Sequence, residues 1–170
     1  MAARPATANS SSFTTTTPSD REITLTRLFD APPDVVFEAM TRPEHVSRWW
    51  GVLDDAHTVS KCEIDLRPGG RWRFVSSTPQ GEVCFYGEYR EIAAPHRLVY
   101  TEIFAPFPDV ESVVTQTLTR EGARTRLTVT AAYPSVEVRD MVLGTGMERG
   151  AALSYDRLDE VSTELQQSRV

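Results

Sequence analysis

Cysteine and long apolar stretches are both scarce in this chain. Only two of its 170 residues are cysteines, and its uninterrupted apolar runs, such as Val83-Cys84-Phe85-Tyr86, are a few residues long. A membrane-spanning helix needs roughly 20 apolar residues, and disulfide-stabilised miniproteins are rich in cysteine. With 40% hydrophobic and 25% charged residues, the composition excludes both of these classes and a mostly disordered chain. It indicates one globular domain with a sizeable core.

Basic residues are too few and too scattered to favour binding to a polyanion. The chain has 18 lysine and arginine residues against 24 acidic ones, which gives a net charge of -6. A phosphate backbone would be repelled on average. We therefore expect no nucleic-acid partner, and the short apolar runs give no reason to expect a membrane partner.

The motifs of several enzyme classes are missing. There is no Gly-x-Ser-x-Gly turn of a hydrolase and no Gly-x-x-x-x-Gly-Lys-Ser/Thr phosphate loop. The three histidines, His45, His57 and His96, are scattered, and Asp54-Asp55-Ala56-His57 has no second histidine or cysteine at a supporting spacing. We predict no metal site and no cofactor, and we favour a non-enzymatic role.

The two cysteines, Cys62 and Cys84, each lie inside a predicted strand rather than at the end of a loop. The N-terminal residues lack the apolar central region of a secretory signal. We therefore predict that both cysteines are small buried hydrophobic residues rather than a disulfide pair. This arrangement suits a reducing compartment, so the expected location is the cytoplasm.

Composition divides the chain into three parts. Residues 1–20 consist almost wholly of Ala, Ser, Thr, Pro and Asn, and they offer little apolar surface to bury. They predict a disordered N-terminal arm. Residues 21–165 carry periodic apolar patterns and predict a single domain, and residues 166–170 are expected to form a short tail.

Alternation with a period of two predicts seven strands. In the first, residues 21–29, the side chains of Ile23, Leu25 and Phe29 share one face. Turns rich in proline and glycine, such as Arg67-Pro68-Gly69-Gly70, separate the later strands. These six form a meander over residues 62–66, 71–75, 83–92, 97–104, 111–119 and 125–133.

Apolar residues at a spacing of three to four predict helices before and after the meander. Residues 34–41 and 43–50 are expected to form two short helices, the second of which ends at Gly51. After Pro134, an apolar stripe over residues 138–165 predicts one long helix. Gly144 and Gly146 lie near its beginning and lower helix stability, so they mark either a kink or a close approach to the sheet.

The order of these elements predicts an α+β protein. Its curved antiparallel seven-stranded sheet wraps around the long C-terminal helix, with two short helices after the first strand. Such a sheet is too wide for one helix to fill its concave face, so we expect a cavity between them. This cavity is the main functional indication in the sequence.

Several segments then invite comparison with a known family. They are residues 27–32, 43–51, 65–72, 87–92, 95–101 and 146–158, which include Asp65-Leu66-Arg67-Pro68-Gly69-Gly70-Arg71-Trp72. In these segments, over about residues 21–165, the chain closely resembles the activator of heat-shock protein 90 ATPase homologue-like family. That family belongs to the START and birch-pollen-allergen superfamily, also called SRPBCC. The resemblance implies a helix-grip fold and, in different members, hydrophobic-ligand binding, polyketide cyclisation, drug sequestration or co-chaperone action.

Large or flexible apolar side chains are the candidates for the cavity wall. Trp49 and Trp50 end a short helix, where a ring can either close a pocket or pack in the core. Methionines on the long helix suit a wall that adapts to varied ligands. The residues that we predict to bind the ligand are Trp50, Trp72, Phe74, Tyr89, Met141 and Met147.

Two glutamates on the predicted strands are the candidates for chemistry. If Glu88 or Glu102 points into an apolar cavity, its pKa would be raised and it could act as a general acid or base. Arg27 or Arg71 would be its partner. Because strands normally expose their charged side, we favour the outward orientation for both glutamates.

These observations predict a cytoplasmic protein that binds a small hydrophobic or aromatic molecule between the sheet and the C-terminal helix. One alternative is a co-chaperone that activates a heat-shock protein 90 type ATPase. Another is a cyclase-like or hydrolase-like enzyme that uses carboxylates in the cavity. The sequence leaves open the identity of the ligand and whether the chain forms a homodimer.

Overall fold

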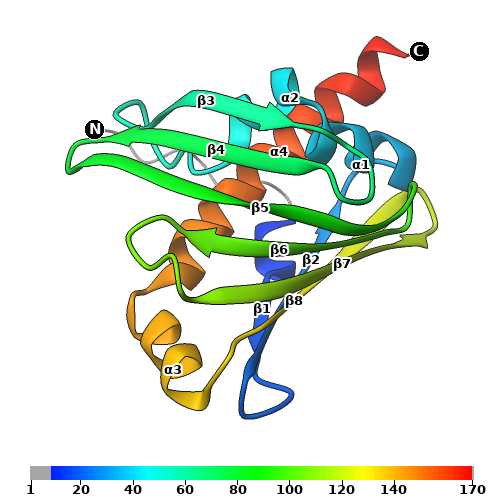
Figure 1. The fold of residues 1–170 in the computed structure, drawn as a ribbon. Helices are drawn as coiled ribbons and strands as arrows, with labels where there is room; N and C mark the ends of the chain where they lie inside the picture. The colour runs from blue at the N-terminus through cyan, green and yellow to red at the C-terminus, as the bar shows by residue number, and fades with distance from the viewer. Residues whose placement is uncertain (1–8, 170) are drawn as a thin grey trace.

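The structure is a computed structural model, and it describes residues 9–169. One antiparallel sheet carries the fold, and the long helix α4 runs diagonally across its face (Figure 1). The elements in chain order are η1 (Ser10–Ser12), β1 (Thr14–Thr16), β2 (Glu22–Phe29), α1 (Pro33–Thr41), α2 (Pro43–Trp49), β3 (Thr58–Ile64), β4 (Arg71–Thr78), β5 (Gly81–Ala93), β6 (Arg97–Phe104), β7 (Glu111–Glu121), β8 (Arg124–Ala132), α3 (Val136–Gly144) and α4 (Met147–Ser168).

The sheet has the order β1-β2-β8-β7-β6-β5-β4-β3. The seven predicted strands correspond to β2–β8, and the α+β arrangement of a meander with a long C-terminal helix is confirmed. The predicted strand number is wrong by one. The eighth strand, β1, pairs with β2 in the register Thr14↔Thr26 and Thr16↔Thr24.

The additional strand comes from the segment that was expected to be disordered. Asn9 is buried. Its side-chain Nδ2 atom donates to Asp159 Oδ2 at 3.0 Å, and its backbone carbonyl oxygen accepts from Arg27 Nε at 3.1 Å. Ser10 Oγ lies 2.6 Å from Asp156 Oδ1. Short polar residues become ordered here because they satisfy buried charges, which composition does not reveal. Residues 1–8 of the predicted arm lie outside the described residues.

The long helix predicted after Pro134 is two helices, α3 and α4. Gly146 separates them with a φ of 75°, a left-handed conformation that favours glycine. A Cβ atom added at Gly144 or Gly146 would meet nothing within 4 Å, so the glycines mark a break and not a close approach to the sheet. At the other end α4 continues to Ser168, so the predicted tail at 166–170 is helical over most of its length.

The two short helices close one end of the concave face. α1 and α2 each begin with a proline at the first helical position, which needs no backbone donor there. Val36 of α1, Val46 of α2 and Leu158 of α4 are fully buried and belong to one core cluster that joins the three helices. One end of the concave face is therefore solid core, and only the other end leaves space.

The cysteines are free, as predicted, and both are half-buried in strands. Cys62 on β3 packs against the core, and burial raises the pKa of its thiol to about 11. Cys84 lies on β5 opposite Val75. In the part of the chain that the structure describes, no helix combines the length and apolarity that a membrane span requires.

Candidate functional site

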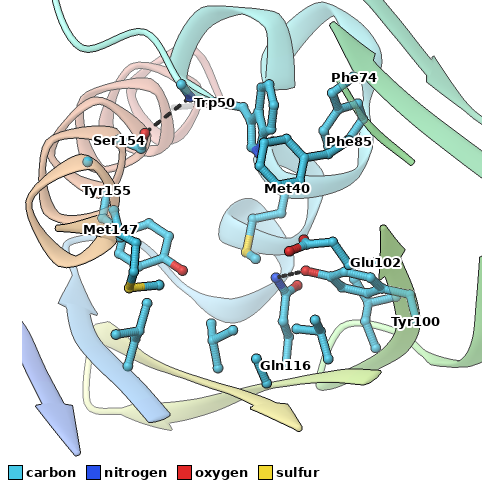
Figure 2. Close-up of a pocket in the computed structure, with 18 of the residues that line it drawn as sticks. Met40, Trp50, Phe74, Phe85, Tyr100, Glu102, Gln116, Met147, Ser154 and Tyr155 are labelled. Carbon is cyan, nitrogen blue, oxygen red and sulfur yellow. Dashed lines mark hydrogen bonds between the residues drawn. The ribbon is translucent and has the colours of Figure 1, made fainter. Parts of the chain in front are cut away.

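A cavity of about 370 Å³ lies between the concave face of the sheet and the first turns of α4 (Figure 2). Sites for small molecules usually enclose about 300–1,000 Å³, so this one suits a compact guest. Strands β2 and β4–β8 supply most of its wall, with the loop after α2 on one side. Gly51 N in that loop donates to Ser154 Oγ at 3.1 Å, which fastens the loop to α4.

Five of the six residues predicted to bind a ligand lie on this wall. Trp50 sits edge-on to Phe74 and Phe85, with ring centroids 5.2 and 5.5 Å away. Trp72 packs beside Phe74 at 4.9 Å. The five are Trp50, Trp72, Phe74, Tyr89 and Met147.

Met141 is the exception, and its assignment to the wall is wrong. It lies on α3, where its side chain is 49% exposed. The break at Gly146 ends the continuous helical stripe that placed Met141 and Met147 on one face. Of the two methionines predicted to bind the ligand, Met147, the first residue of α4, is the one that lines the cavity.

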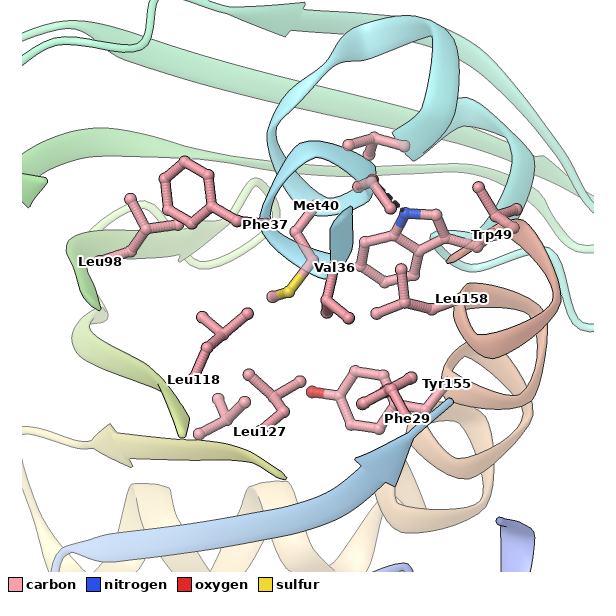
Figure 3. Close-up of a cluster of buried hydrophobic side chains, with 14 of the residues drawn as sticks. Phe29, Val36, Phe37, Met40, Trp49, Leu98, Leu118, Leu127, Tyr155 and Leu158 are labelled. Carbon is pink, nitrogen blue, oxygen red and sulfur yellow. Dashed lines mark hydrogen bonds between the residues drawn. The ribbon is translucent and has the colours of Figure 1, made fainter. Parts of the chain in front are cut away.

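The two adjacent tryptophans have different roles, although both reach the cavity. Trp49 is 6% exposed, and its Nε1 atom donates to the Ala39 carbonyl oxygen at 2.9 Å. Figure 3 shows its ring within the buried cluster, on the same side as Leu158. Trp50 is half-buried and contributes its ring to the wall. Trp49 thus belongs mainly to the core and Trp50 to the cavity.

Trp72 is held in place by a close approach between β5 and β6. Its Nε1 atom donates to the Thr101 carbonyl oxygen at 3.1 Å, next to Gly87. A Cβ atom at Gly87 would lie 1.8 Å from that oxygen and 2.8 Å from the indole nitrogen. Only glycine leaves room for this arrangement, so Gly87 determines the position of the Trp72 indole in the cavity wall.

Replacing Gly87 with alanine is therefore expected to lower the free energy of unfolding by about 1–3 kcal/mol, the usual cost of overpacking. The indole of Trp72 must also shift, so the near-ultraviolet circular dichroism should change. Chemical denaturation measures the first effect. Gly144→Ala is the control, since its Cβ meets nothing within 4 Å. A Gly87→Ala protein with the parent's stability and spectrum would contradict this account.

Glu102 points into the cavity, so the outward orientation predicted for it is wrong. Its side chain lies on the same face of β6 as Tyr100, which also lines the wall. Figure 2 shows the carboxylate directed into the open space beside Tyr100 and Gln116. Glu88 is on the face of β5 opposite the wall residues Phe85 and Tyr89, as expected.

The surroundings of Glu102 are mostly apolar. Burial raises the pKa of its carboxyl from 4.5 to about 7. Burial, and then the negative charge of Glu102, also raise the pKa of the Tyr100, Tyr133 and Tyr155 hydroxyls. Gln116 Nε2 donates to Tyr100 Oη at 2.8 Å. The cavity thus has an aromatic side and one polar end.

Neither predicted arginine partner reaches Glu102. Arg27 is completely buried, but its Nη1 atom lies 2.7 Å from Asp156 Oδ1 and its Nη2 atom 3.7 Å from Asp159 Oδ2, beneath α4. Arg71 is exposed on β4. Neither predicted arginine therefore pairs with Glu102, whereas Arg71 lies opposite Glu88 in the register of β4 and β5, outside the cavity.

Among residues 9–169, no three histidine, cysteine or acidic side chains lie close enough together to hold a metal ion. His57 Nδ1 lies 2.7 Å from Asp54 Oδ1 in the loop before β3, and neither residue lines the cavity. Within the cavity, the polar groups that converge are those around Glu102.

The fold and the cavity can now be compared with known proteins. The family model for Activator of Hsp90 ATPase homolog 1-like protein matches residues 30–163. The chain belongs to this family. No curated protein gives a significant match.

Several solved structures share the fold over most of the chain. A protein from Rhodobacter sphaeroides superposes with a TM-score of 0.79 at 25% identity, covering 86% of this chain and 95% of its own. Protein Ms6760 from Mycobacterium smegmatis gives 0.78 at 27% identity, covering 92% and 96%. Protein NE0264 from Nitrosomonas europaea has the same fold, with a TM-score of 0.75 at 22% identity and coverage of 90% and 99%.

Three residues with polar groups line the cavity but were not predicted from the sequence as part of its polar end. They are Gln116, Tyr133 and Tyr155. Gln116 carried a signal, because it replaces an apolar residue in the alternation between Val114 and Leu118. Tyr133 continues the inward face of β8 beyond Ala131. These residues lie near Glu102 because of how the strands pair. The alternation of apolar and polar residues within one strand does not specify that pairing.

Proposed function

We propose that this protein binds a small hydrophobic or aromatic molecule in the cavity between the sheet and α4. The observation that carries the proposal is a cavity of about 370 Å³ with aromatic walls, set against the buried core of the domain. The two free cysteines support a cytoplasmic location, since disulfides are rare in reducing compartments.

Burial of apolar surface would supply the affinity. Each Å² removed from water contributes roughly 25 cal/mol before the entropic costs of association. Trp50, Phe74 and Phe85 meet edge to face and present a rigid aromatic side. Met40 and Met147 project from the opposite elements, α1 and α4, and their flexible side chains can adapt to the shape of a guest.

Titration with a set of small aliphatic and aromatic molecules is expected to change the tryptophan fluorescence, because Trp50 and Trp72 line the cavity. Trp50→Ala should weaken binding by about tenfold, since the guest loses a large contact surface. Isothermal titration calorimetry checks the affinities. Phe107→Ala, at a side chain that is 49% exposed and does not line the cavity, is the matched control. Absence of binding by every molecule in the set would refute the proposal.

A second candidate, acid–base catalysis on the bound molecule, is favoured by the position of Glu102. A carboxyl whose pKa lies at about 7 exchanges protons readily near neutral pH. The hydroxyls of Tyr100, Tyr133 and Tyr155 lie at the same end of the cavity. Recovery of an unaltered guest after incubation with the protein distinguishes binding from turnover.

A further inference from the structure

The polar end of the cavity has an uncompensated charge. Among the described residues that line it, Glu102 is the only one with a formally charged side chain, and none is basic. Burial is the only influence on its pKa, and no described residue forms a hydrogen bond or ion pair with its carboxylate. A carboxylate without a partner in mostly apolar surroundings is costly unless something compensates it.

The two carboxylates of α4 beside Arg27, by contrast, have partners in the same fold. Asp159 is 3% exposed, and it accepts hydrogen bonds from Asn9 Nδ2 and from Asp30 N, with Arg27 beside it. Asp156 accepts from Arg27 and from Ser10. Glu102 has no such partner among the described residues and lines the cavity, so a bound guest is the group placed to pair with it.

Resting on the proposed binding function, we infer that the guest carries a protonated amine on its apolar or aromatic body, and that Glu102 is the counter-charge for that amine. An ammonium group is small and carries several donors, which matches one carboxylate among neutral acceptors. Gln116 donates to Tyr100 Oη, which leaves its amide oxygen as an acceptor. A carboxylate or phosphate guest would meet Glu102 with the same sign of charge.

The aromatic side suits the same class of guest. Tyr100 and Tyr155 lie at the polar end, and Trp50, Phe74 and Phe85 continue the wall away from it. Aromatic faces attract cations in addition to apolar groups. The apolar body of the guest would occupy the space between Trp50 and Met147, with its nitrogen toward Glu102.

The ionisation of the groups at this end sets the pH dependence. The groups that face Glu102 are Tyr100 on β6, Tyr133 after β8 and Tyr155 on α4, and their raised pKa values keep them neutral. An alkylamine stays protonated below pH ~10. Glu102, with a pKa of about 7, is then the group that titrates near neutrality. Protonation of Glu102 removes the counter-charge, so amine affinity falls as the pH falls.

Three probes that share one aromatic body test the inference by calorimetry: naphthylethylamine, naphthylethanol and naphthylacetate. At about pH 8 the amine should bind at least tenfold more tightly than the alcohol, and the acetate most weakly. At about pH 6 the amine should lose about tenfold in affinity, because only about a tenth of Glu102 stays ionised. Binding of the alcohol should not change.

Two variants complete the test. Glu102→Gln keeps the shape and removes a buried charge, so it should fold, bind the alcohol as before and lose both the preference for the amine and the pH dependence. Glu88→Gln, at a glutamate on the opposite sheet face, should behave like the parent. If the alcohol and amine bind equally, or the acetate binds best, the amine inference is overturned while the proposed binding function stands. If none of the three binds, the inference is overturned, and the wider set of apolar molecules then decides the binding function.

Discussion

Replacing Arg27 with methionine is expected to lower the free energy of unfolding by about 3–5 kcal/mol, the cost of breaking a buried ion pair from one side. Its guanidinium is 0% exposed, contacts Asp156 and the Asn9 carbonyl oxygen, and lies 5.4 Å from the Phe29 ring centroid. Methionine fills similar space but leaves buried acceptors without a donor. Urea denaturation followed by circular dichroism measures the loss.

Two comparisons isolate the charge at this position. Arg126→Met breaks the exposed pair with Glu121 and should cost less than about 1 kcal/mol. Adding Asp156→Asn to Arg27→Met should recover part of the loss, because one unpaired charge disappears. A cost for Arg27→Met as small as that for Arg126→Met would show that the buried network contributes little to stability.

The second large effect is expected from Trp49→Ala, which should destabilise the domain by about 3–5 kcal/mol. The substitution empties a site where α1, α2 and α4 meet, and it removes the hydrogen bond to Ala39. Tyr155 would also lose its neighbour at a centroid distance of 6.5 Å. Thermal and chemical unfolding check the value.

Trp50→Ala is the matched variant for this measurement, since it removes the same side chain one residue later. It should cost clearly less stability than Trp49→Ala, because the Trp50 ring borders empty space that already exists. The two variants should thus separate stability from binding, with the larger effect on binding at Trp50. Equal losses of stability would contradict the division of roles between core and cavity.

Strands that lie within the domain could be predicted from the sequence because each buries one face. Alternation in Ile23, Leu25 and Phe29 identified β2, and turns containing proline and glycine bounded the meander. β1 could not be found this way, since Thr14–Thr16 has no apolar face. It is held by pairing to β2 at the sheet edge and, just before it in the chain, by the contact between Asn9 and Asp159 of α4.

The aromatic wall could be predicted, but the polar end could not. Trp72 and Phe74 share a face whichever way the sheet curves, so the pattern alone grouped them. For Glu102 the general tendency of strands to expose charge gave the wrong face. The missing information was that Tyr100, two residues earlier, faces a void that can also accommodate a carboxyl group.

The hydrogen bond from Asn9 to Asp159 joins residues 150 positions apart. Contacts of such long sequence separation form slowly, because chain closure must precede any gain. Helix α4 also follows every strand of the sheet in chain order. Until α4 docks, the concave face has no lid, and the apolar wall is exposed to water and to other nascent chains. We therefore expect the binding-competent state to mature late in folding, in a step that depends on docking of α4.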